Sequence, residues 1–171
     1  MEPDFETIVR CAMWRDPDLR NWKFAASLEV HGVTSGRAPA GEHEWQPDRE
    51  RMIELARRTV QLTGSLGLDD VAMRERLGLP PGCAAGWYPL IVAFDDMCRD
   101  AGHPVMSYVQ IKSWVGSLGI YHRSDDYSRD LELTAARLST CVCEICGAPG
   151  RLRGSDGWWA TRCDDHAGEP A

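Results

Sequence analysis

Two short stretches near the end of the chain, Cys143-Glu-Ile-Cys146 and Cys163-Asp-Asp-His166, carry its most specific pattern. Together they read C-x2-C, sixteen intervening residues and C-x2-H. This spacing is typical of a structural zinc site built from three cysteine thiolates and one histidine imidazole. The predicted ligands of a single Zn²⁺ ion are Cys143, Cys146, Cys163 and His166.

The residues between the two stretches favour a chain that folds round a metal ion. Gly147 follows the second cysteine, and glycine tolerates the positive φ that a tight knuckle needs. Residues 151–162 are expected to form two short strands around the turn Gly154-Ser-Asp-Gly157, which returns the second ligand pair to the first. Four protein ligands complete a tetrahedron and leave no open position, so the predicted site is structural rather than catalytic.

Other ligand sets stay open at this point. Cys141 could replace Cys143, although C-x4-C makes a looser knuckle. His166 is the least secure ligand, because Asp164 or Asp165 could stand in for it. Disulfide bonds among these cysteines would require an oxidising compartment.

The composition is that of a globular protein with an acidic excess. The chain has 171 residues, 43% of them hydrophobic, and a formal net charge of −7. This length suits one compact domain, or a main domain with the metal module attached. The negative net charge argues against general electrostatic binding to nucleic acid.

Neither a membrane span nor a secretion signal is recognisable in the sequence. No apolar stretch reaches transmembrane length, and the acidic start Met1-Glu-Pro-Asp-Phe-Glu6 lacks a signal-peptide pattern. Seven cysteines with a metal spacing and no such signal predict a reducing, cytoplasmic location. Three cysteines lie far from the pattern and are expected to be free, buried thiols, namely Cys11, Cys83 and Cys98.

Residues 1–82 are predicted to form a mainly helical region. Asp48 is expected to cap a helix that runs to about Gln61, with its apolar residues on one face. A Gly- and Pro-rich loop is expected over 32–47, and residues 23–30 suit either a strand or a helix. Further short helices are expected over 3–14 and 71–77, and a turn or a boundary over 79–82.

Residues 83–140 are predicted to form a helix, a hairpin and a second helix. Pro89 suits the first turn of a helix that ends at Gly102. Its apolar face is expected to be buried and its charged face solvated. The residues assigned to the solvated face are Asp95, Asp96, Arg99 and Asp100.

The hairpin is expected to pair a strand over 105–112 with a strand over 118–122, through a Gly-containing turn over 114–117. Alternation predicts that Val105, Val109 and Ile111 share one face of the first strand. Ser124 is expected to cap the final helix, with Asp125 and Asp126 near its positive end. The apolar stripe expected on that helix is Tyr127, Leu131, Ala135 and Leu138.

The predicted fold class is therefore α+β. Helices pack on a small antiparallel hairpin, and residues 141–171 form a C-terminal module similar to a treble clef or zinc ribbon.

Residues 86–166 resemble the C-terminal half of many small uncharacterised proteins of bacteria and their phages. The shared features are Gly86-Trp-Tyr88, Gln110-Ile-Lys112, the turn and strand 116–121, the knuckle 143–150 and the ending 159–166. Such proteins tend to carry Lys-Phe-Gly-Gly-Leu-Arg in the hairpin, whereas this chain has Ser113-Trp-Val-Gly-Ser-Leu-Gly119. The resemblance implies a phage or mobile-element origin and no established activity, and the missing arginine removes any role that would depend on it.

Binding to another protein is the function that these patterns favour. The acidic charge, the closed metal site and the seven tryptophans fit an adaptor or inhibitor without its own catalytic site. The sequence leaves the oligomeric state open.

Nucleic-acid binding is the alternative function. It would use three arginines beside the metal ligands, namely Arg151, Arg153 and Arg162. A second basic group is interleaved with Glu50 and Glu54, which favours ordinary ion pairs along a helix; its members are Arg49, Arg51, Arg57 and Arg58.

An enzyme is the least favoured class, because no catalytic motif accompanies the histidines. The candidate groups are His122 with Asp125 and Asp126, and His103 beside Pro104.

Overall fold

The computed structural model describes residues 48–169 except 66, 104–106, 124 and 156–157. The helix, the loop and the undecided segment expected before residue 48 lie outside the described residues, as does Cys11. In chain order the elements are α3 (Arg49–Leu62), α4 (Asp70–Leu77), the 3₁₀ turn η1 (Ala85–Trp87), α5 (Tyr88–Asp100), β1 (Tyr108–Trp114), β2 (Ser117–His122), α6 (Asp126–Ser139), β3 (Arg151–Ser155) and β4 (Trp158–Arg162).

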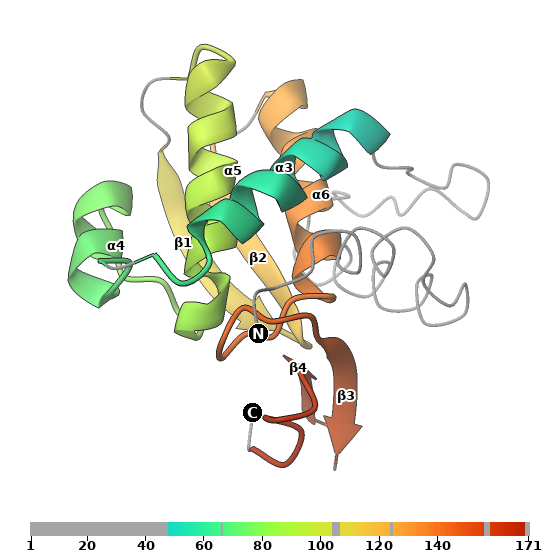
Figure 1. Ribbon diagram of the computed structural model, residues 1–171. Coiled ribbons are helices and arrows are strands. Elements are labelled where there is room, and N and C mark those ends of the chain that lie inside the picture. The colour runs from blue at the N-terminus through green and yellow to red at the C-terminus, as the bar shows by residue number, and fades with distance from the viewer. Residues whose placement is uncertain (1–47, 66, 104–106, 124, 156–157, 170–171) are drawn as a thin grey trace.

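The predicted α+β class is confirmed by this arrangement. The strands form two separate two-stranded antiparallel sheets, β1–β2 and β3–β4. Figure 1 shows α5 and α6 beside the β1–β2 hairpin, with α3 crossing both helices and α4 at the edge. The β3–β4 hairpin lies at the end of this unit, below the first turn of α5.

Helix α3 forms because its ends are satisfied and one face is apolar. The side chain of Asp48 accepts a hydrogen bond from the backbone N–H of Arg51, at 3.0 Å, as the sequence predicted. Met52, Leu55 and Ala56 lie on the buried face, which packs against α5 and α6. The helix is therefore fixed by burial more than by its own propensity.

Helix α4 matches the prediction, whereas residues 79–82 form an extended segment and not a turn. Asp69 caps the helix, and Gly78 ends it in the left-handed conformation. The chain then runs along β1, where the N–H of Gly82 donates to the carbonyl of Ile111, at 2.7 Å. The segment 79–82 thus covers part of the free edge of the hairpin.

Helix α5 is buried on almost every side, which differs from the prediction. Pro89 occupies its first turn as expected. The expected solvated face is wrong at Asp95, whose side chain is 0% exposed. Its carboxylate accepts hydrogen bonds from Arg76 at 2.9 Å, Arg99 at 2.7 Å and the Tyr108 hydroxyl at 2.6 Å. These partners come from α4 and β1 as well as α5, so the periodicity of α5 alone could not reveal them.

The β1–β2 hairpin has the predicted antiparallel pairing, but its first strand begins later, at Tyr108. The expected alternation is wrong at Val109, which is 72% exposed while Ile111 is buried. A bulge between Tyr108 and Gln110 shifts the register and turns Val109 outward. Val105 lies outside the described residues.

The turn of this hairpin places two consecutive residues at positive φ. Val115 has φ 50° and Gly116 has φ 72°, as in the tight turns that match strand twist. A β-branched residue in this region is strained, so the surrounding contacts must hold Val115 there.

Helix α6 begins one residue later than expected. The N-cap is Asp125 rather than Ser124, which lies outside the described residues. Asp125 accepts from the N–H of Ser128 at 2.9 Å, and the Ser128 hydroxyl reaches back to form a capping box. The predicted apolar stripe is confirmed, because Leu131, Ala135 and Leu138 are buried and Tyr127 packs against the core.

No helix among the described residues is long and apolar enough to cross a membrane.

Candidate metal centre

The four predicted ligands come together in the structure. The ligand atoms of Cys143, Cys146, Cys163 and His166 all lie within 4.8 Å of one another. The Nδ1 atom of His166 is 3.6 Å from the Cys143 sulfur and 3.1 Å from the Cys163 sulfur. The sulfurs of Cys146 and Cys163 are 3.7 Å apart. This group could hold a metal ion.

Backbone hydrogen bonds build the first half of the site. The N–H of Cys143 donates to the carbonyl of Ala148 at 2.8 Å, and the N–H of Gly147 donates to the carbonyl of Cys143 at 2.9 Å. Gly147 has φ 78°, the conformation that the sequence predicted for it. The chain therefore closes a tight knuckle that aims both sulfurs at one point.

The β3–β4 hairpin builds the second half. Its register pairs Leu152 with Thr161 and Arg153 with Ala160, which confirms the two predicted strands. Strand β4 ends at Arg162, so Cys163 and His166 follow it directly. The isolated bridge between Val142 and Pro149 closes the knuckle beside them.

The surroundings of the sulfurs favour an ionised thiolate at Cys143. Burial alone would raise the pKa of Cys143, but backbone N–H groups of Cys163, Cys146 and Ile145 point at its sulfur and lower that pKa to about 7. Burial and the neighbouring Cys143 thiol raise the pKa of Cys146 to about 12. A dication at the centre would offset the repulsion among several thiolates.

The donors fit a metal, and the alternative ligand sets do not match the geometry. Cys141 is buried and is not part of the group. Asp164 is 86% exposed and accepts hydrogen bonds from Arg151 and Arg153 instead. The described cysteines are all free thiols, so the structure contains no disulfide among them.

The metal knuckle is docked on the helical unit by polar contacts that the sequence did not predict. The indole Nε1–H of Trp87 donates to the carbonyl of Val142 at 2.8 Å, and the N–H of Gly86 donates to the carbonyl of Glu144 at 2.8 Å. The sequence identified the motif Gly86-Trp-Tyr88 as a feature shared with similar proteins. Its pattern does not indicate which backbone carbonyls it binds.

A buried ion pair joins the two halves of the metal module. Arg162, beside the third ligand, pairs with Glu144 of the knuckle, and both side chains are almost fully buried. The module is linked to the β1–β2 hairpin by two further contacts. The Ser113 hydroxyl of β1 donates to the other carboxylate oxygen of Glu144 at 3.1 Å, and the Thr161 hydroxyl donates to the carbonyl of Gly116 at 2.6 Å. The centre therefore contacts both η1 and the β1–β2 hairpin.

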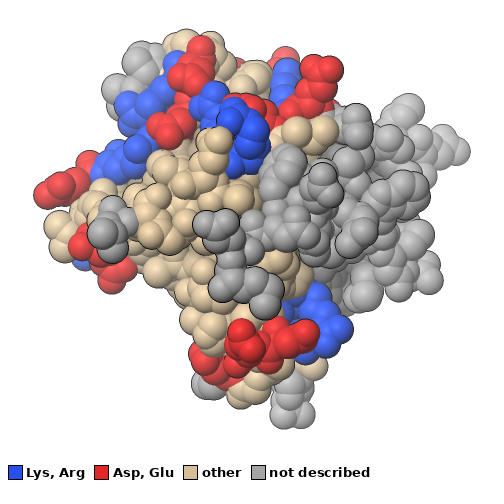
Figure 2. Space-filling view, in the orientation of Figure 1, with Lys and Arg blue, Asp and Glu red and all other residues tan. Residues whose placement is uncertain are grey.

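The arginines that were candidates for binding nucleic acid form ion pairs within the chain. Arg162 is buried against Glu144, while Arg151 and Arg153 both pair with Asp164. Figure 2 shows basic and acidic residues intermingled on the displayed face rather than gathered by sign.

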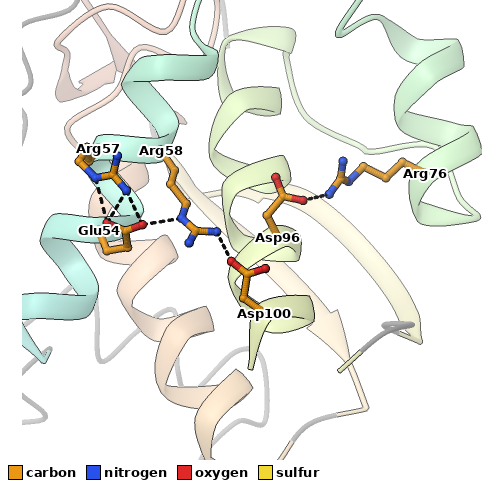
Figure 3. Close-up of polar contacts among 6 residues, drawn as sticks. All are labelled: Glu54, Arg57, Arg58, Arg76, Asp96 and Asp100. Carbon is orange, nitrogen blue, oxygen red and sulfur yellow. Dashed lines mark hydrogen bonds and ion pairs between the residues drawn. The ribbon is translucent and has the colours of Figure 1, made fainter. Parts of the chain in front are cut away.

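Two members of the basic group on α3, Arg57 and Arg58, form the ion pairs along the helix that the sequence suggested, whereas Arg51 pairs with Asp130 of α6. Arg57 and Arg58 both bind Glu54 at 2.6 Å, and Arg58 also reaches Asp100 of α5 at 2.7 Å (Figure 3). Arg76 of α4 pairs with Asp96 on α5.

The candidate catalytic histidines are paired differently from the expectation. His122 lies 3.4 Å from Glu132 rather than beside Asp125 or Asp126, and its side chain is fully buried. Burial lowers the pKa of His122, but Glu132 and the Arg123 carbonyl outweigh burial, so the pKa is raised overall.

His103, the second candidate, binds the capping carboxylate of Asp125 at 2.9 Å and stacks on Tyr127. Its contacts tie the start of α6 to the end of α5. Both histidines thus serve packing among the elements that surround them.

Comparison with family models, with curated proteins and with solved structures finds no match.

Proposed function

We propose that this chain is a small cytoplasmic zinc protein whose closed metal centre fixes a surface for binding another protein. The observation that carries the proposal is the convergence of three thiols and one imidazole within 4.8 Å. The ligands of the proposed ion are Cys143, Cys146, Cys163 and His166.

Zinc is favoured over other metals by the donor set. Soft thiolates with one imidazole in a compact tetrahedral group suit Zn²⁺, whereas Mg²⁺ and Ca²⁺ select oxygen ligands. Because four protein ligands would fill the coordination shell, the ion would supply folding energy and no open position for substrate.

Metal analysis of the purified full-length chain tests this assignment. We expect one zinc per chain, and we expect Cys146→Ser to lose it while Cys83→Ser retains it. Cys83→Ser is a suitable control because it makes the same chemical change at a free thiol outside the group. Burial raises the pKa of the Cys83 thiol to about 12. Zinc at the wild-type level in Cys146→Ser would remove the assignment.

A protein partner is supported by the surface of the metal module. Trp158, at the start of β4, is 73% exposed, and exposed tryptophans often anchor protein interfaces. Arg162 is buried against Glu144, and Arg151 and Arg153 share Asp164, so these pairs leave one of the three arginine charges unbalanced for a phosphate. The resemblance to small bacterial and phage proteins suggests an accessory that acts on a host protein.

Affinity purification from a bacterial host, with mass spectrometry of the bound material, tests the partner. The zinc-loaded chain is compared with Trp158→Ala and with Val71→Ala, a matched loss of an exposed apolar side chain on α4. We expect a stoichiometric protein that Trp158→Ala loses and Val71→Ala retains. Recovery of DNA or RNA alone, sensitive to nuclease and to modest salt, would favour the nucleic-acid alternative instead.

A further inference from the structure

The turn η1, which leads into α5, lies against the metal knuckle. A Cβ atom at Gly86 would lie 2.4 Å from the carbonyl oxygen of Cys143 and 2.7 Å from the backbone nitrogen of Cys146. These are backbone atoms, which cannot swing aside as a flexible side chain would. Only glycine therefore allows this approach without displacing the knuckle.

One hydrogen bond of Gly86 reaches a peptide group between the first two ligands. The N–H of Gly86 donates to the carbonyl of Glu144 at 2.8 Å, and Glu144 directly follows Cys143 in the chain. Gly86 thus holds the peptide group between Glu144 and Ile145, inside the knuckle that joins Cys143 to Cys146.

Trp87 holds the peptide on the other side of the same ligand. Its fully buried indole donates to the carbonyl of Val142 at 2.8 Å, immediately before Cys143. Gly86 and Trp87 together fix the peptide groups that flank the first ligand. They come from a segment more than fifty residues earlier in the chain.

We propose that Gly86 and Trp87 are positioning residues for the metal centre, so that metal occupancy and the order of the turn η1 are reciprocally linked. This inference rests on the proposed zinc function. Partners of metal ligands typically change metal affinity about 10–100-fold when they are removed. Reciprocity requires that the metal, in turn, stabilises the contacts that favour it.

The affinity of the full-length chain for Co²⁺ tests the link, because Co²⁺ reports its own coordination through visible absorption. Trp87→Phe keeps a buried aromatic ring, removes the donor to Val142 and makes the fully buried side chain smaller. We expect it to weaken Co²⁺ binding about tenfold or more, measured by chelator competition. Gly86→Ala should weaken binding further, whereas Gly168→Ala, whose added Cβ meets nothing within 4 Å, should bind as wild type.

A variant that destabilises a distant part of the core serves as a control. It distinguishes a specific effect on the metal ligands from a general loss of stability. Met73→Ala removes a fully buried side chain from α4, which lies away from β3 and β4 (Figure 1). It should lower the Tm and leave Co²⁺ affinity within about threefold of wild type. An equal loss of affinity in Met73→Ala and Trp87→Phe would overturn the proposal.

Nuclear magnetic resonance of the wild-type chain gives a readout that needs no variant to fold. The indole signal of Trp87 and the amide signal of Gly86 should shift, and the amide should exchange faster, when a chelator removes the metal. Unchanged signals from both groups after complete metal removal would refute the link. Failure of the wild-type chain to bind any metal would instead refute the proposed function.

Discussion

The helical layer and the metal module are stabilised by different forces. In the helical layer, large apolar side chains such as Leu55, Leu90 and Leu131 are fully buried against one another. The buried apolar residues of the metal module are smaller and include Val142, Cys143, Ala160 and Cys163, which offer much less apolar area. Burial can hold the first region, whereas the second depends on polar contacts and on the proposed ion.

This difference predicts which substitutions should destabilise each region. A region with an apolar core loses stability in proportion to the side chain removed, at any metal concentration. A region organised by four ligands responds to loss of one ligand as a whole. The predictions below use this contrast, from the largest expected effect to the smallest.

Removing one ligand should have the largest effect. Metal binding in small zinc modules supplies about 10–16 kcal/mol of apparent free energy. We expect Cys146→Ser, or chelation of the wild-type chain, to make the region after residue 141 sensitive to protease while most helical circular dichroism remains. Simultaneous loss of the helical signal would show that the helical layer also needs the metal.

A core truncation should act on the other region, with an intermediate effect. Leu131→Ala in α6 removes a fully buried side chain and should lower the free energy of unfolding by about 3 kcal/mol. Chemical denaturation should give the same loss with and without a chelator. A loss that appears only in the metal-loaded chain would contradict the separation of the two regions.

Neutralising the buried carboxylate of α5 should cost less. Asp95→Asn weakens the contacts to Arg76 and Arg99, which are themselves about one-third exposed, and should cost about 2 kcal/mol. Asp96→Asn, at a more exposed partner of Arg76, should change stability by less than about 0.5 kcal/mol. Equal losses of unfolding free energy in Asp95→Asn and Asp96→Asn would show that the burial of Asp95 does not increase the cost of neutralising it.

The smallest effect should be a pH dependence that comes from His122. Its pKa is raised in the folded chain, so the folded state holds the proton more tightly than the unfolded state. The resulting stability is complete below about pH 6.5 and is lost as pH rises through the folded pKa, with a slope of at most about 1.4 kcal/mol per pH unit.

Denaturation at a series of pH values measures this slope. His122→Gln should remove the part of the slope above pH 6.5, and Glu132→Gln should reduce it because Glu132 is the main group that raises the pKa. The same slope in wild type and His122→Gln would assign the pH dependence to another group.

Local patterns predicted much of this structure from the sequence. The cysteine and histidine spacing located the candidate ligands, and Asp48 and Pro89 marked helix starts correctly, because each signal is contained within a few residues. The predicted N-cap of α6 was Ser124, and the observed N-cap is Asp125, one residue later. Serine and aspartate are both good capping side chains.

The wrong or missing predictions involve partners distant in sequence. Asp95 is buried because Arg76 and Tyr108 approach it from other elements. Val109 is exposed because a bulge interrupts the alternation. The closeness of Gly86 to the knuckle is a property of tertiary packing, and no periodicity within α5 encodes it.

X-ray absorption at the zinc edge of the purified full-length protein tests the central claim most directly. We predict one zinc with three sulfur neighbours at about 2.3 Å and one nitrogen neighbour at about 2.0–2.1 Å. A protein free of metal, or a zinc spectrum that requires water or other oxygen ligands in place of these donors, would contradict the account.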